Sequence, residues 1–71
     1  FNTSKEIYIG LLNLRLLRLK EVCRTTGLSR SSVYVAMKHG TFPGSVRISL
    51  RAVAWKSTEI EAWIASRPSV S

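Results

Sequence analysis

The stretch that decides the fold runs from Gly27 to Gly40 and reads Gly-Leu-Ser-Arg-Ser-Ser-Val-Tyr-Val-Ala-Met-Lys-His-Gly. Ser29 is a good helix N-cap because its hydroxyl can accept a hydrogen bond from a free backbone N–H of the first turn. Val33 and Met37 lie four residues apart, so they share the face that should pack on the core. Glycine readily ends a helix in the left-handed conformation, so we expect the helix to stop at Gly40.

The residues before this stretch predict a second, shorter helix. Lys20 to Thr26 mixes polar residues with Val22 and Cys23, which should point inward. Gly27 then favours a helix stop. A helix, a short turn containing glycine and a second, capped helix are typical of the helix-turn-helix. The second helix of that motif is the element that enters a DNA groove.

The N-terminal part of the chain gives weaker signals. Leu12, Leu14 and Leu16 alternate with polar residues, which suits a strand with one buried face. We treat residues 1–14 as an arm that could form a helix, extend a strand or be partly a tag. Because the chain begins at Phe1 rather than at a methionine, we expect it to be a fragment of a longer one.

Residues 46–48 and 52–55 both alternate between apolar and polar or small side chains, which predicts a β-hairpin. Residues 49–51 would lie near its tip, so Arg51 would project from a wing. Together with a third helix near the C-terminus, these elements predict an α+β fold. We expect a small winged helix-turn-helix with three helices and a short β-hairpin wing.

The third helix should begin near residue 57. Ser57 or Thr58 is expected to cap it. Ile60, Trp63 and Ile64 have the spacing of one apolar helix face. Both tryptophans of the chain are therefore expected to pack in the core rather than to stack on bases.

The charge distribution points to an anionic partner. Eleven Lys and Arg against four Asp and Glu give a net charge of +7. No acidic residue lies between Val22 and Thr58. A block of one sign on a folded domain favours a polyanion, and nucleic acid is the usual one. The competing interpretation is that the charge only keeps a small domain in solution.

Other functional classes find little support. The single cysteine, Cys23, allows no intramolecular disulfide, which fits a reducing, cytoplasmic setting. Binding to DNA would make such a protein nucleoid-associated. One cysteine and one histidine cannot assemble a structural zinc site. His39 has no paired carboxylate, serine or cysteine, and the sequence shows no phosphate-binding glycine loop and no carboxylate pair suited to acid–base chemistry. We therefore expect no enzyme activity, no catalytic residue, no metal and no cofactor. No apolar run approaches the ~18 residues of a membrane span, so we expect no membrane partner.

Candidate DNA-binding residues follow from the open face of the second helix and from the hairpin. They are Arg30, Ser31, Ser32, Tyr34, Val35, Lys38, Arg47 and Arg51. Arginine makes the commonest bidentate contact with guanine, which favours a base contact for Arg30. Arg51 could enter a minor groove. Capping, packing on the hairpin and simple solvation stay open as alternative roles for the serines, Tyr34 and Lys38.

Several pieces of the chain together resemble the AlpA family of prophage and genomic-island regulators, within the excisionase-like, MerR-like winged helix-turn-helix group. The pieces are Arg15 to Val22, Thr26 to Tyr34, Met37 to Pro43, residues 46–48, Ala54-Trp55 and residues 59–64 with Arg67-Pro68. The resemblance divides the chain into an arm over 1–14, a DNA-binding domain over 15–68 and a tail over 69–71.

The resemblance implies sequence-specific binding to duplex DNA and regulation of integrase or excision genes. Its alternative is an excisionase, a recombination directionality factor that bends DNA and steers an integrase. The chain departs from the family at the wing, where Ile48-Ser-Leu-Arg51 replaces a glycine-rich turn, and at Val35, where a basic residue is common. Without glycine the tip should be longer or looser than a two-residue primed turn.

Duplex DNA is therefore the expected partner. A second copy of the chain, as a dimer or an array on DNA, and an integrase stay open as further partners. A hypothesis of a different class is an interaction module whose basic face binds an acidic protein or RNA.

Overall fold

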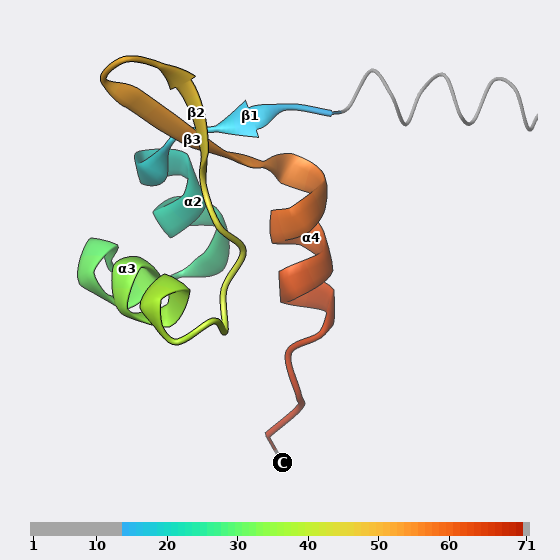
Figure 1. Ribbon diagram of the computed structural model, residues 1–71. Coiled ribbons are helices and arrows are strands. Elements are labelled where there is room, and N and C mark those ends of the chain that lie inside the picture. Colours follow the sequence, from blue (N-terminus) through green and yellow to red (C-terminus); the bar gives the residue numbers. More distant parts are fainter. Residues whose placement is uncertain (1–13, 71) are drawn as a thin grey trace, which may run out of the picture.

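The computed structural model describes residues 14–70, which form three helices and a three-stranded antiparallel sheet (Figure 1). The elements are β1 (Leu16–Leu17), α2 (Leu19–Thr26), α3 (Arg30–Lys38), β2 (Val46–Ser49), β3 (Ala52–Lys56) and α4 (Ser57–Ala65). The strand order is β1-β3-β2, so β3 is central. In Figure 1 the sheet lies above the helices, and the β2–β3 hairpin extends to the same side as α3. The predicted α+β winged helix-turn-helix is confirmed.

The core takes one large side chain from nearly every element. Its buried members are Leu17 of β1, Val22 of α2, Val33 of α3, Phe42 of the connecting loop, Trp55 of β3 and Ile60 of α4. Trp55 is fully buried, and its indole N–H donates to the carbonyl of Pro43 at 3.1 Å. A buried indole needs such a partner because an unpaired N–H would lose its hydration without compensation. Trp55 therefore fixes the loop after α3 against the sheet.

The turn between α2 and α3 forms as the sequence predicts. Gly27 adopts φ +81°, and its N–H donates to the carbonyl of Cys23 at 2.8 Å. The Thr26 hydroxyl donates to the Val22 carbonyl at 2.8 Å, which closes the last turn of α2. The Ser29 hydroxyl accepts from the N–H of Ser32 at 3.1 Å and so caps α3. These local bonds fix where α3 begins.

The wing, which is the β2–β3 hairpin, turns at Leu50 and Arg51 without glycine. No residue other than glycine in the described chain has a positive φ, so the turn is not of a primed type. The register shifts between Arg47 and Ser49, which inserts an extra residue into β2. Arg47 also donates from Nη1 to the carbonyl of Leu50 at 2.9 Å. The bulge and this hydrogen bond replace the glycine turn expected of the family.

The strand before α2 is shorter than the alternating leucines suggest. Leu17 is buried in the core, whereas Leu14 is 49% and Leu16 is 52% exposed. Because successive side chains of a strand point to opposite faces, burial of Leu17 turns Leu16 outward. The expectation that Leu14 and Leu16 lie on a buried face is therefore wrong. Leu12 and most of the predicted arm lie outside the described residues.

The start of α4 also differs from the expected cap. Lys56 occupies the N-cap position and makes no side-chain cap. Ser57 is instead buried, and its hydroxyl accepts from the Arg15 N–H at 2.9 Å. The Ser57 N–H donates to the Arg15 carbonyl at 2.8 Å. Ser57 thus ties the chain before β1 to α4, because its backbone and side chain both bond Arg15.

One face of α4 covers the loop after α3. The rings of Trp63 and Phe42 meet edge to face with centroids 4.9 Å apart, and the Trp63 indole donates to the Thr41 carbonyl at 2.8 Å. The guanidinium of Arg67 lies 4.1 Å from the Trp63 ring centroid. Ile64 remains 38% exposed. Of the three residues predicted to form the apolar face of this helix, only Ile60 and Trp63 therefore pack on the rest of the fold.

Candidate DNA-binding surface

Helix α3 presents one face to the core and leaves the opposite face open. Val33 is fully buried, and Met37 packs beside it. At 3.6 residues per turn, Ser31, Val35 and Lys38 lie on the side away from Val33. All three are exposed. These side chains form an open face that another molecule can contact, and Val35, at 55% exposure, lies near its middle.

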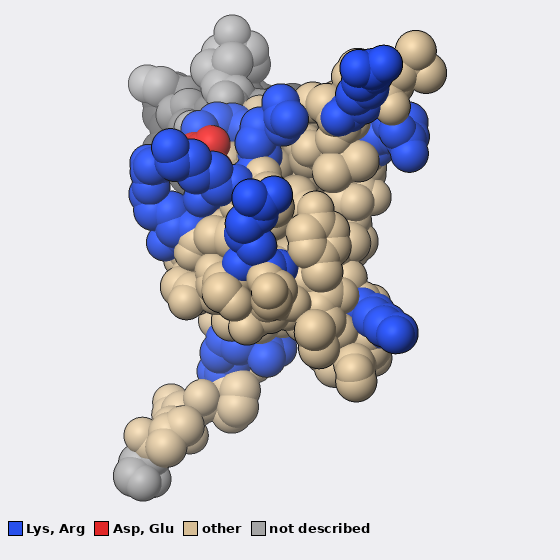
Figure 2. Space-filling model, turned by 90° about the vertical axis from the view of Figure 1, so that its left-hand side faces the viewer, with Lys and Arg blue, Asp and Glu red and all other residues tan. Residues whose placement is uncertain are grey.

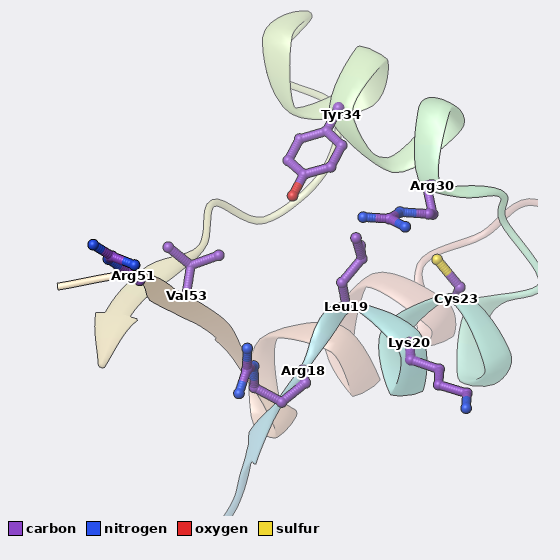
Figure 3. A pocket seen from close by; sticks show the side chains of 8 residues that line it. All are labelled: Arg18, Leu19, Lys20, Cys23, Arg30, Tyr34, Arg51 and Val53. Atoms are coloured by element: carbon purple, nitrogen blue, oxygen red, sulfur yellow. The ribbon is translucent and has the colours of Figure 1, made fainter. Parts of the chain in front are cut away.

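A cleft of about 580 Å³ separates α3 from the wing. Its lining residues come from α2 and the residue before it, from α3 and from the wing: Arg18, Leu19, Lys20, Cys23, Arg30, Tyr34, Arg51 and Val53. Figure 3 shows Arg30 and Tyr34 extending from α3 into this space, with Arg18 on its opposite side and Arg51 on the hairpin. We call this feature the basic cleft.

Four cationic side chains line the basic cleft, namely Arg18, Lys20, Arg30 and Arg51. None of them forms a hydrogen bond or salt bridge through its side chain with another residue between 14 and 70. The nearby carboxylate of Glu21 is paired with Arg15 at 3.2 Å. In Figure 2, which views the side carrying α3 and the wing tip, blue side chains spread across the face and red is confined to one small spot. The cleft can therefore hold an anionic chain.

The predicted site residues divide between two sides of α3. Arg30, Tyr34 and Arg51 meet in the basic cleft. Ser31, Ser32 and Val35 instead line a shallower hollow of about 470 Å³ on the other side of the helix, with Ala36, His39 and Thr41. Lys38 is exposed near the end of α3 and lines neither of these two hollows.

Two of the residues predicted to bind DNA have structural roles within the fold. The Ser32 hydroxyl accepts a hydrogen bond from the Ser29 hydroxyl at 2.9 Å, so Ser32 takes part in the cap of α3. Arg47 donates to the Leu50 carbonyl and so holds the wing tip. Ser32 therefore helps to cap α3 and Arg47 supports the wing tip, and neither role depends on DNA.

Arg18 and Lys20 belong to the cleft but were not among the residues predicted from the sequence. They flank the start of α2, where the positive end of the helix dipole disfavours cations. Basic residues at a helix N-terminus are thus poorly explained by helix stability. That mismatch is a sequence signal that could have marked them.

The described part of the chain offers neither a membrane-spanning helix nor a metal centre. Across residues 14–70, no helix is both long and apolar enough to cross a bilayer. Within the same residues, no three His, Cys, Asp or Glu side chains gather where they could hold a metal ion. Cys23 lines the basic cleft, whereas His39 lines the hollow on the other side of α3.

The fold and the cleft define a winged helix-turn-helix protein with a cationic face over its second helix and wing. The chain belongs to the AlpA family, since residues 15–68 match the family described as prophage CP4-57 regulatory protein (AlpA). It is 43% identical over 53 residues to the uncharacterized protein ORF88 of Enterobacteria phage P4, covering 75% of this chain and 60% of that protein. It is 30% identical over 60 residues to the DNA-binding transcriptional activator AlpA of Escherichia coli K12, covering 76% of this chain and 86% of that protein.

Proposed function

We propose that this chain is a sequence-specific DNA-binding regulator of a prophage or genomic island that controls integrase or excision genes. The basic cleft carries this proposal. Four cationic side chains line the space between α3 and the wing, and none of them bonds another residue between 14 and 70. Phosphate contacts supply nearly all of the non-specific affinity of DNA-binding proteins and a large share of their specific affinity. Membership of a family of prophage regulators, and a relative named as a DNA-binding activator, support the same function.

In this proposal α3 lies in the major groove and one DNA backbone lies in the basic cleft. Ser31, Val35 and Lys38 face the bases from the open side of α3. Arg30 points into the cleft across from Arg18, which favours a phosphate contact over the guanine contact expected from the sequence. Phosphate contacts fix the position of the protein on the duplex, whereas base contacts select the sequence.

The test begins with selection of bound sequences from a random pool of duplex DNA. The proposal predicts one enriched motif, and it predicts that this motif occurs near an integrase or excision gene of the element that encodes the chain. Expression of the chain should then change the output of a reporter driven by that promoter. Absence of any enriched motif would contradict sequence-specific DNA binding.

The second candidate is the excisionase, which binds the same DNA and bends it for an integrase. An exposed leucine at the wing tip favours this candidate, because DNA-bending proteins insert such side chains between base pairs. Recombination with the cognate integrase in vitro, without transcription, separates the two. Excision stimulated by the chain would support the excisionase, and a reporter response without excision would support the transcriptional regulator.

A further inference from the structure

The wing tip carries a large apolar side chain that the fold does not use. Leu50 is 92% exposed, and it occupies a two-residue turn with Arg51. Turn positions are normally filled by glycine, proline, asparagine, aspartate or serine, each for a conformational reason that leucine lacks. Neither core packing nor turn geometry therefore accounts for a leucine here.

Two local features support the tip that presents Leu50. The Leu50 carbonyl accepts from Arg47 Nη1 at 2.9 Å. The register shift between Arg47 and Ser49 fixes the extra residue just before the turn. At its other end, the wing continues into β3, whose Trp55 is fully buried. Leu50 is thus carried by a hairpin whose β3 strand is anchored in the core.

The cleft decides which part of a duplex the tip would meet. Arg51 lines the basic cleft opposite Arg30, so the cleft lies between α3 and the wing (Figure 3). Each backbone of a DNA duplex separates a major groove from a minor groove. With α3 in the major groove and a backbone in the cleft, the wing tip lies on the minor-groove side of that backbone.

We propose that Leu50 is an apolar wedge that enters the minor groove, inserts between two base pairs and kinks the duplex toward the major groove. This inference rests on the proposed binding of duplex DNA. Leucine is one of the side chains that architectural proteins insert in this way. A kink toward the major groove bends the DNA around α3, and Arg51 beside the wedge neutralises the adjacent phosphates. The wedge favours a pyrimidine–purine step, because such steps unstack most easily.

Two fluorescence measurements on the 71-residue chain with its selected duplex test the wedge. One uses 2-aminopurine placed in turn at each step next to the α3 site, since this base brightens when it is unstacked. The other uses energy transfer between dyes at the two duplex ends, which reports bending. The protein should brighten 2-aminopurine at one step only and should raise the energy transfer.

The variant Leu50→Ala should still select the same sequence but lose the brightening and the rise in transfer. Its affinity should change by less than about tenfold, because the burial that leucine gains is offset by the cost of unstacking. Leu16→Ala is the matched control, since Leu16 is also an exposed leucine but lies on β1 and does not line the basic cleft. The Leu16→Ala variant should unstack and bend the DNA as the unchanged chain does.

Two results would overturn the wedge. Specific binding by the unchanged chain without brightening or bending would refute the wedge and leave DNA binding intact. Unstacking and bending that survive in Leu50→Ala would show that another residue is responsible. Absence of specific binding to any duplex is a different failure, because it rejects the proposed function together with the wedge.

Discussion

Arg30 and Lys56 carry the same charge in different surroundings. Arg30 lines the basic cleft, whereas Lys56 lies beside Leu14 and Leu16 in another hollow. Arg30→Ala should therefore weaken binding to all DNA sequences by a similar factor. It should also make the negative slope of log K against log salt concentration less steep by about 0.9, which is the contribution of one phosphate contact.

Titrations of the selected site and of a scrambled duplex at several salt concentrations measure both quantities. Lys56→Ala removes an equal charge and should leave the slope nearly unchanged. A loss of preference at one base pair in Arg30→Ala, with the salt slope retained, would instead identify Arg30 as a base contact.

Val35 offers a methyl-bearing surface in the middle of the open face of α3. It is 55% exposed, and an apolar side chain in the major groove recognises the methyl group of thymine. Val35→Ala should lower the affinity for the selected site by about 1 kcal/mol, the order of one lost methyl contact. Replacing the contacted thymine by uracil should lower it equally.

The two changes should not add when they are combined, because each removes one half of the same contact. Competition titrations with singly substituted duplexes identify the thymine. If Val35→Ala and the uracil substitution lowered the affinity additively at every thymine position, Val35 would not contact a methyl group.

At the scale of the elements, the turn before α3 depends on Gly27. Its φ of +81° strains any side chain, although a Cβ there would meet no atom within 4 Å. Gly27→Ala should therefore lower the free energy of unfolding by about 1 kcal/mol through backbone strain alone. Urea or thermal unfolding of the purified chain measures the change.

Gly44 provides a control of opposite sign. A Cβ at Gly44 also meets nothing within 4 Å, but Gly44 does not have a positive φ. Gly44→Ala should leave stability unchanged or raise it by about 0.4–1 kcal/mol, because alanine restricts the unfolded chain. Similar destabilisation by both substitutions would mean that strain at φ +81° is not the cause at Gly27.

The elements themselves could be predicted where the signals are local. The left-handed glycine after α2, the serine cap of α3 and the alternation of the hairpin act through neighbouring residues, so the sequence displays them directly. The face of β1 and the role of Ser57 could not be predicted in this way. Both depend on how β1 pairs with β3 and meets the start of α4, with Arg15 and Ser57 separated by 42 residues.

At the scale of the whole molecule, the site is an arrangement that no single element contains. The open face of α3 was predictable, because burial of Val33 determines which residues turn outward. The cleft was not, since it forms only when packing brings the start of α2, the flank of α3 and the wing together. Arg18 and Lys20 enter the site through that packing, which explains why the sequence pattern alone overlooked them.

The central claim is that the basic cleft holds a DNA backbone. The most direct test is the salt dependence of affinity for the selected duplex, measured by fluorescence anisotropy for the unchanged chain and for a variant combining Arg18→Ala, Arg30→Ala and Arg51→Ala. Removing three phosphate contacts should make the slope of log K against log salt less steep by about 2.7. A variant with an intact fold and an unchanged slope would contradict the claim.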